Sequence, residues 1–356
     1  MLKVCVYDVA ASTRGAQTIL EGFYNEAIKH KDIKWTFILS NESLQESDNI
    51  EVKSYFWAKK SKLHRIFFEY LYAPLFLHCD KYDCIFSLQN ICMHTRSDKQ
   101  VVYIQQSIPF SDVKFDFKEN RIEWIYQNII SKSIYKSAKK AIMVIVQTEW
   151  MKKALVERTL IDEEKVVVAP PSLHVDINEE YCDCDGSRHT FFYPAAYATY
   201  KNHLCVVKAV RILNEKGIKD FTVLFTIDKI ETEWSEVPNQ VKFIGNQEYG
   251  EILNYYKEST LVFPSKLETF GLPLLEAKQT GSRIIASDKP FSHEILDGYN
   301  NVCFFNVNDP EQLAKLMEQT MENQIPYSKE NIENNNFIQN QGWSKVINTI
   351  RGSCRY

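Results

Sequence analysis

The sequence lacks any uninterrupted apolar run of membrane-spanning length, and its 11 glycines and 11 prolines are scattered singly over 356 residues. Without such a run, no membrane-spanning helix is expected, and without Gly or Pro clusters the chain is not of low complexity. Residues 1–8 have the pattern of a strand rather than of a secretory signal. We therefore expect an ordered cytoplasmic protein, with a position at the inner face of the cytoplasmic membrane left open.

An excess of positive charge is also missing, since the formal net charge is −4. Nucleic acid is therefore not an expected partner. The nine cysteines are odd in number and lie mostly in apolar runs, which indicates reduced thiols. Cys182 and Cys184 have no second cysteine pair at metal-site spacing, and the eight histidines form no two-His helical pair. No metal site is expected.

Apolar runs of strand length alternate with longer segments of helical periodicity, which is typical of parallel sheets covered by helices on both faces. The pattern halts at Val166–Pro171 and at the polar stretch 176–188, and then restarts. Two Rossmann-like domains are predicted, one at 1–172 and one at 173–338. A closing helix at 339–356 is expected to pack near the first.

The predicted strands are short apolar runs bounded by polar residues or proline. In the first domain they are Lys3–Tyr7, Thr36–Leu39, Cys84–Ser87, Val101–Gln105, Ala141–Gln147 and the run from Val166. In the second they are Thr190–Tyr193, Thr222–Ile227, Val241–Ile244, Leu261–Phe263, Arg283–Ala286 and Val302–Phe305. Helices are predicted near Gln17–His30, Arg121–Ser137 and Gly342–Ile350.

The most informative segment is 261–277, which predicts a strand, a loop and a helix. Pro264 ends the strand, Gly271 permits a tight turn, and Pro273 suits the first helical position, where an N–H would be unpaired anyway. The helix start is expected to offer free N–H groups around Leu272, Leu274 and Leu275. With the positive end of the helix dipole behind them, these groups predict a diphosphate site.

Two carboxylates accompany this helix. Glu276, about one turn inside it, can accept hydrogen bonds from ribose hydroxyls. Glu268, on the preceding loop, can bind sugar hydroxyls or stabilise positive charge that develops on the sugar ring. Taken singly, Glu276 is better explained as a partner of the helix dipole, and Glu268 as a solvated loop residue.

The whole segment resembles glycosyltransferase family 4, whose hallmark is Glu, seven residues, Glu. The matching residues are Pro264, Ser265, Glu268, Phe270, Gly271, Leu272, Pro273, Glu276, Ala277 and Gly281. The resemblance covers most of the second half and is looser in the first. It implies the GT-B architecture, with two Rossmann-like domains whose parallel sheets face a central cleft. By the same resemblance, the domain at 1–172 binds the acceptor and the domain at 173–338 binds the nucleotide sugar. It also implies that Glu276 binds the ribose, Glu268 the donor sugar, and Phe270, Gly271 and Leu272 the sugar or phosphate region.

A second strand-loop-helix element contains Lys201 and Asn202. The Lys201 ammonium can neutralise a diphosphate and the charge that grows on a leaving group. By resemblance, Lys201 is the phosphate-binding lysine of the family, and Asn202 follows it at the donor site. Many relatives carry an arginine about five residues earlier, where this chain has Ala196 and Tyr197. The group that replaces that arginine is not assigned.

The first half offers fewer candidates. Gly15 lies between the first strand and the first helix, where the family has a glycine-rich loop near the donor phosphates and the acceptor. An ordinary strand-to-helix turn explains it equally well. Gln105 ends a strand at a position where similar sequences often have histidine, so it is expected to bind sugar by hydrogen bonds. Asp183 and Asp185 fall in the predicted linker and are not expected to bind metal.

The resemblance implies a metal-independent retaining glycosyltransferase without a cofactor. Its substrates would be a UDP- or GDP-linked sugar and a saccharide or lipid-linked saccharide acceptor, in synthesis of a bacterial surface polysaccharide such as O-antigen or capsule. Alternatives are a catalytically silent sugar-nucleotide-binding or scaffold protein and a GT-B phosphorylase or epimerase. A dehydrogenase is disfavoured because no Gly-x-Gly-x-x-Gly follows the first strand.

The segment 59–76 combines a basic cluster with many aromatic residues. Two interpretations remain open. It is either a core helix with a solvated basic end or a face that contacts anionic lipid, where a lipid-linked acceptor would reside.

Overall fold

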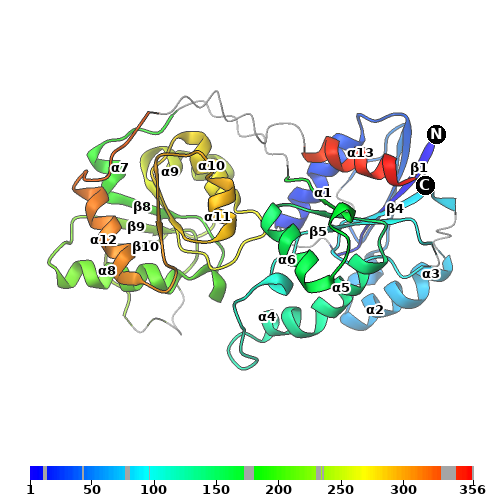
Figure 1. Ribbon diagram of the computed structural model, residues 1–356, viewed down its shortest axis with the longest axis horizontal. Helices are drawn as coiled ribbons and strands as arrows, with labels where there is room; N and C mark the ends of the chain where they lie inside the picture. The colour runs from blue at the N-terminus through cyan, green and yellow to red at the C-terminus, as the bar shows by residue number, and fades with distance from the viewer. Residues whose placement is uncertain are drawn as a thin grey trace. The chain divides into compact units, whose positions relative to one another are not determined.

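The computed structural model describes residues 1–10, 14–41, 44–76, 81–95, 97–171, 180–229, 234, 236–329 and 342–354. The chain divides into two compact units (Figure 1). The first unit consists of Met1–Leu173 together with Ile338–Tyr356, and the second of His174–Phe337. None of the helices in the described ranges combines the length and the apolar character needed to span a bilayer.

The first unit is built on a seven-stranded sheet in the order β3-β2-β1-β4-β5-β6-β7, with every pair parallel. Its strands are β1 (Leu2–Asp8), β2 (Ile33–Leu39), β3 (Ile50–Ser54), β4 (Cys84–Ser87), β5 (Gln100–Ile104), β6 (Met143–Val146) and β7 (Val166–Val168). The helices that cover it include α1 (Arg14–Ala27), α5 (Ser131–Lys140), α6 (Glu149–Thr159) and α13 (Gly342–Cys354).

Successive side chains along the buried strands point to opposite faces of this sheet, and a hydrophobic core lies on each face. Val4 and Val6 of β1 enter a cluster that contains residues of α1 and α13, whereas Cys5 and Tyr7 enter a cluster on the other face. This is the period of two that an extended strand imposes. Strands that are apolar on both sides require cover on both faces, and the helices provide it.

The closing helix α13 packs on α1 (Figure 1). The ring of Trp343 meets that of Phe23 edge to face, with centroids 5.6 Å apart. Close approach is possible because α1 has no side chain at Gly22, where a Cβ would lie 2.9 Å from Nε1 of Trp343. The last residues of the chain thus complete the core of the unit that contains its first residues.

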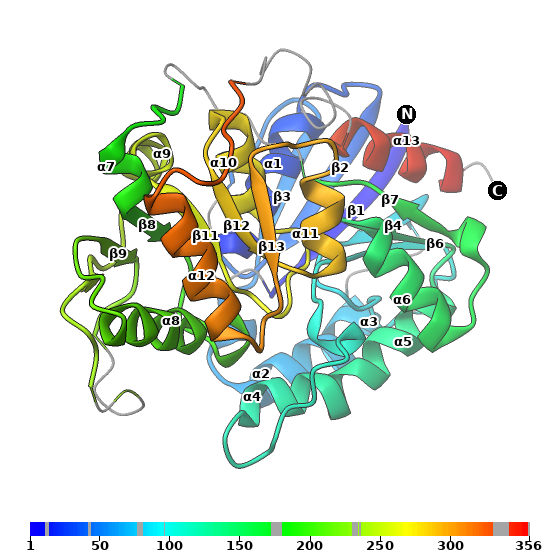
Figure 2. The same cartoon turned by 60° about the vertical axis from the view of Figure 1, so that its left-hand side comes forward.

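The second unit is built on a six-stranded parallel sheet in the order β10-β9-β8-β11-β12-β13. Its strands are β8 (Thr190–Tyr193), β9 (Thr222–Phe225), β10 (Val241–Phe243), β11 (Thr260–Phe263), β12 (Ile284–Ser287) and β13 (Val302–Phe305). Its helices are α7 (Asp185–His189), α8 (His203–Glu215), α9 (Tyr249–Glu258), α10 (Leu272–Thr280), α11 (Pro290–Ile295) and α12 (Pro310–Met321) (Figure 2).

Local chemistry sets several of these boundaries. Asp309 caps α12 by accepting a hydrogen bond from the Gln312 amide at 2.9 Å, and Pro310 occupies the first turn, where its missing N–H costs nothing. At the carboxyl end of α10, Gly281 adopts the left-handed conformation that commonly ends a helix.

The predicted α/β class with two parallel sheets is confirmed, and each predicted strand has a counterpart within a few residues. One strand was missed. β3 lies at the sheet edge and is only half buried, so its residues Ile50–Ser54 form no apolar run. The helix predicted at 121–137 is a longer one that runs from α4 (Arg121–Ile125) through a π-helical turn, η5 (Tyr126–Ile130), to the end of α5.

Candidate functional site

The strand order of the second sheet reverses between β8 and β11. From β8 the chain proceeds outward to β9 and β10, and it then returns to place β11 on the other side of β8. In open parallel sheets of this kind, ligands bind beyond the carboxyl ends of the strands at such a reversal, because the two loops there diverge. The loops that follow β8 and β11 carry Lys201 and Glu268.

Lys201 and Glu268 form an ion pair across this reversal. The Lys201 Nζ donates to Glu268 Oε1 at 2.6 Å, and the two side chains are 19% and 12% exposed. The buried Tyr193 hydroxyl of β8 donates to the backbone carbonyl of Lys201 at 2.8 Å, which fixes the position of the Lys201 backbone. Both charged residues are candidates from the sequence, but their ion pair was not predicted.

Asn202 links the backbone segments around this site by hydrogen bonds. It adopts a left-handed conformation (φ 60°) just before α8, and its Nδ2 donates to the carbonyls of Pro264 at 3.1 Å and Val307 at 2.9 Å. Both N–H groups of the amide are therefore used within the protein, leaving only its oxygen for a ligand. The amide of Lys266 also donates to the Tyr200 carbonyl at 2.8 Å, which ties the two loops together.

The start of α10 differs in detail from the prediction. The helix begins at Leu272, so Pro273 occupies its second position rather than its first. The amides of Leu274 and Leu275 both donate to the Gly271 carbonyl, at 3.0 and 3.4 Å, and are not the free donors that were expected. The reason is that the helix closes its first turn immediately on Gly271.

The remaining amides at this helix start are those of Gly271 and Leu272, which precede the first intrahelical bond. Gly271 has a φ of 100°, a conformation that a side chain would strain, and a Cβ there would lie 3.3 Å from Leu274 Cδ1. Phe270 is buried, so only its backbone can meet a ligand.

Glu276 is a buried carboxyl group on α10. It is only 7% exposed and accepts a hydrogen bond at 2.8 Å from the hydroxyl of Tyr256, which is itself buried on α9. Burial raises the pKa of Glu276 from 4.5 to about 7, although hydrogen bonds from Tyr256 and Tyr249 oppose the rise. This hydrogen bond joins α9 to α10 and was not predicted from the sequence.

Asp183 has a structural role. Its carboxylate accepts two hydrogen bonds from the buried guanidinium of Arg283, at 2.7 Å from Nε and 3.1 Å from Nη2. That guanidinium also donates to the Ile325 carbonyl at 2.8 Å and stacks over the ring of Tyr327. Within the described ranges, no group of three His, Cys, Asp or Glu side chains is placed to hold a metal ion.

The candidates in the first unit lie at the carboxyl edge of its sheet. Gln105 follows β5, and its side chain donates to the Leu88 carbonyl at 2.6 Å, while its backbone amide donates to Asn90 Oδ1 at 2.7 Å. Gly15 is the second residue of α1, and residues 11–13 of the loop before it lie outside the described residues. The strand order of this sheet also reverses beside β1, where β4 is its other neighbour.

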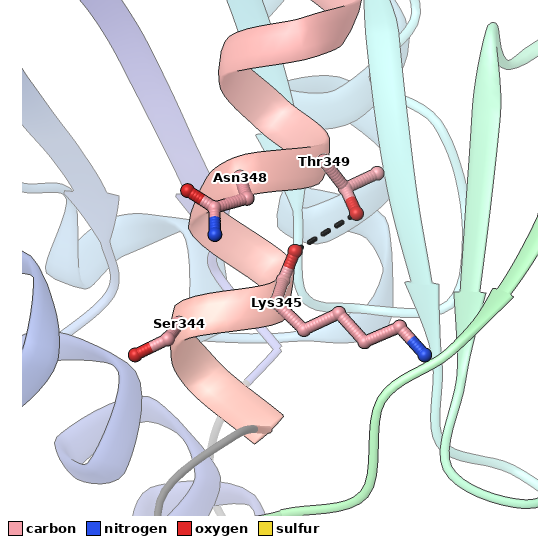
Figure 3. Close-up of a pocket in the computed structure, with 4 residues that line it drawn as sticks. All are labelled: Ser344, Lys345, Asn348 and Thr349. Atoms are coloured by element: carbon pink, nitrogen blue, oxygen red, sulfur yellow. Dashed lines mark hydrogen bonds between the residues drawn. The ribbon is translucent and has the colours of Figure 1, made fainter.

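A surface pocket lies elsewhere, on the outer side of α13, and is lined by Ser344, Lys345, Asn348 and Thr349 (Figure 3). All four residues come from the polar side of one helix, and the Thr349 hydroxyl donates to the Lys345 carbonyl at 2.9 Å. The Ser344 hydroxyl donates to Glu26 Oε1 of α1 at 3.0 Å, so one of the four lining side chains is already bonded within the protein.

Comparison with known proteins places these features in context. Residues 184–340 match the family model of glycosyl transferases group 1. A curated relative is the O-antigen chain mannosyltransferase RfbU of Salmonella typhimurium, which is 23% identical over 213 residues. That match covers 57% of this chain and 57% of the relative, so the chain spans little more than half of that protein's length in the alignment.

Solved structures resemble the chain over nearly its whole length. HepE of Anabaena, in complex with UDP and glucose, matches with a TM-score of 0.65 at 14% identity and covers 99% of this chain and 100% of its own. The apo form of the lipopolysaccharide outer core galactosyltransferase WaaB has a TM-score of 0.69 at 13% identity, with 99% of each chain covered. At such low identity the likeness establishes the fold, which is the GT-B fold.

Proposed function

We propose that the protein is a retaining glycosyltransferase that moves a hexose from a nucleotide-activated donor to a saccharide or lipid-linked saccharide acceptor. The observation that carries the proposal is the Lys201–Glu268 pair at the strand reversal of the second sheet. Around it are the first-turn amides of α10 and the buried carboxyl of Glu276. The match of residues 184–340 to glycosyl transferases group 1 supports the same conclusion.

The roles follow from the chemistry of each group. The Lys201 ammonium and the amides of Gly271 and Leu272 neutralise the diphosphate and the charge that it gains on leaving. Glu268 accepts hydrogen bonds from hydroxyls of the donor sugar, and Glu276 from those of the ribose. Asn202 holds the loops in register and can offer its side-chain oxygen.

The bond changes are those of a front-face transfer. The bond between the anomeric carbon and the phosphate oxygen breaks while the acceptor oxygen bonds to that carbon on the same face. The acceptor proton passes to the departing phosphate oxygen, so the products are the glycoside and the nucleoside diphosphate. No protein nucleophile, metal ion or cofactor is part of this scheme.

Both substrates are proposed by class. HepE was solved with UDP and glucose, whereas RfbU is a mannosyltransferase, so uridine and guanosine donors both belong in a first test. The acceptor would be an intermediate of a surface polysaccharide such as O-antigen or capsule, at or near the inner face of the cytoplasmic membrane.

The test begins with thermal stabilisation by UDP-glucose, UDP-galactose and GDP-mannose, and continues with release of nucleoside diphosphate in the presence of a lipid-linked saccharide and of EDTA. Anomeric configuration of the product, read by NMR, checks retention. Lys201→Ala and Glu268→Ala should each lower turnover strongly, whereas Lys219→Ala, an exposed lysine of the same unit, should not. Full activity in the first two variants would refute the proposal.

The rival functions predict different results. A catalytically silent sugar-nucleotide-binding protein would be stabilised by a donor but release no diphosphate with any acceptor. A phosphorylase would consume inorganic phosphate, and an epimerase would convert one nucleotide sugar into another without an acceptor.

A further inference from the structure

The helical segment that follows Ser61 in the first unit carries apolar side chains on two opposite faces. It runs from α2 (Lys62–Phe67) through a π-helical turn, η2 (Phe68–Tyr72), into α3 (Ala73–Phe76). The inner face belongs to the core, where Phe68 and Ala73 are fully buried. This face agrees with the interpretation of the segment as a core helix.

The outer face is also apolar. Its members recur at helical spacing, and each is at least half exposed: Leu63 77%, Ile66 54%, Phe67 50%, Tyr70 53%, Leu71 53% and Leu75 64%. We call these six residues the outer apolar face. Single exposed apolar residues are ordinary, but six on one side of one helix form a contiguous patch that indicates an interaction surface.

A basic cluster borders the outer apolar face. Lys59, Lys60, Lys62 and Arg65 fall within residues 55–68, a stretch without a single Asp or Glu, in a chain whose net charge is −4. The next carboxylate, Glu69, is buried and paired with Arg65 at 2.9 Å. Within residues 55–68 the exposed charged side chains are therefore Lys60 and Lys62.

A second helix of the same unit also exposes apolar side chains. Ile122 of α4 and Ile129 of η5 are 68% and 55% exposed, and Phe117, just before them, is 46% exposed beneath the guanidinium of Arg121. In both Figure 1 and Figure 2 the helices α2 and α4 lie along the lower edge of the first unit. Exposed Asp116 and Glu119 accompany Arg121 here, so the basic border belongs to α2 and not to α4.

We propose that the outer apolar face, with its basic cluster, docks on an anionic lipid bilayer. A helix that lies in the plane of a membrane buries an apolar face with aromatic residues and keeps Lys and Arg at its edge, where they meet lipid phosphates. Interfaces between proteins are instead depleted in lysine. The exposed Lys60 and Lys62 that border the outer apolar face match an anionic surface. The inference does not depend on the proposed transfer reaction.

The test is co-sedimentation of the full chain with vesicles of phosphatidylcholine, with and without phosphatidylglycerol, at low and high salt. Binding should require phosphatidylglycerol and weaken with salt. Lys60→Gln with Lys62→Gln should reduce affinity by about fivefold per lysine. Ile66→Gln with Leu71→Gln should reduce it by about tenfold or more, because two half-exposed apolar side chains are lost.

Matched controls sit elsewhere on the chain. Lys219→Gln with Lys242→Gln removes two exposed lysines of the second unit, and Leu160→Asn removes a leucine that is 87% exposed and adopts a left-handed conformation that asparagine accepts. Both controls should bind vesicles like the parent chain. Circular dichroism and thermal unfolding verify that every variant is folded.

Three outcomes would overturn the proposal. These are equal binding to neutral and anionic vesicles, unchanged binding in both test pairs, and no vesicle binding together with self-association that Ile66→Gln and Leu71→Gln abolish. The last would assign the outer apolar face to a second copy of the chain. Because vesicle binding is measured without donor or acceptor, failure of the transferase assay would not affect this test.

Discussion

Replacement of Glu276 by glutamine should stabilise the protein at neutral and alkaline pH while weakening its binding of nucleotide. The carboxyl is 7% exposed, and burial raises its pKa from 4.5 to about 7. A carboxyl whose pKa is higher in the folded state binds its proton more tightly there. The folded state therefore loses stability as the pH rises through the interval between the two values.

The magnitude follows from the same interval. At 1.36 kcal/mol per pH unit, a rise from 4.5 to about 7 corresponds to roughly 3 kcal/mol. Glu276→Gln keeps an oxygen that can accept the Tyr256 hydrogen bond and removes the charge. The variant should therefore match the parent near pH 4, gain stability relative to it as pH rises, and reach a plateau of up to roughly 3 kcal/mol above pH 7.

Urea unfolding of both proteins between pH 4 and pH 9 measures this difference, in which all other titrating groups cancel. Glu251→Gln, which removes an exposed carboxylate of α9, serves as the control for the loss of one negative charge. A difference that is constant across the pH range would refute the reasoning. A stability difference between variant and parent that grows as the pH falls would also refute it. If ribose hydroxyls bind Glu276, saturating UDP should shrink the plateau, because those donors stabilise the carboxylate of the parent protein.

Three further substitutions test packing and buried charge. Gly22→Ala should destabilise the first unit by about 1–2 kcal/mol in urea unfolding, because its Cβ would meet the Trp343 ring at 2.9 Å and the strain exceeds the gain in helix propensity. Asp183→Asn should cost about 3 kcal/mol or more, since the buried Arg283 guanidinium loses its counter-charge. Burial lowers the pKa of His203 from 6.5 to about 3. The free energy of unfolding of the parent therefore falls as the pH drops through that interval, by roughly 3 kcal/mol at pH 4. His203→Phe should abolish this loss of stability in acid. A parent and variant with parallel pH profiles would contradict the last prediction.

The fold was largely predictable because buried parallel strands are apolar on both sides. Runs such as Cys84–Ser87 and Thr190–Tyr193 have the same bounds in the sequence analysis and in the structure. β3 was not predicted because this edge strand is only half buried and therefore need not be apolar. Its position at the end of the sheet follows from pairing with β2, and pairing leaves no local pattern in the sequence.

The candidate site was predicted by residue type and only partly by geometry. Lys201 and Glu268 were identified separately, and their contact depends on the strand order that places β8 beside β11. The fixed amide of Asn202 and the Tyr256–Glu276 hydrogen bond were not foreseen, because each depends on a partner supplied by tertiary structure. Hydrogen bonds between residues far apart in the chain have no spacing by which a sequence can reveal them.

The pairing of Lys201 with Glu268 leads to a last prediction that separates binding from turnover. The Glu268 carboxylate holds the Lys201 ammonium at 2.6 Å, and it would repel an incoming diphosphate. Glu268→Gln removes that competition and that repulsion, so UDP affinity should rise, by about fivefold if the relief is near 1 kcal/mol, the scale of a partly exposed ion pair. Turnover should nevertheless fall, because the hydrogen bond from a sugar hydroxyl to a carboxylate is lost. Titration calorimetry with UDP, beside the diphosphate-release assay, measures both effects. If Glu268→Gln weakens UDP binding as much as Lys201→Gln does, then Glu268 serves only to position the lysine, and its proposed contact with the donor sugar is wrong.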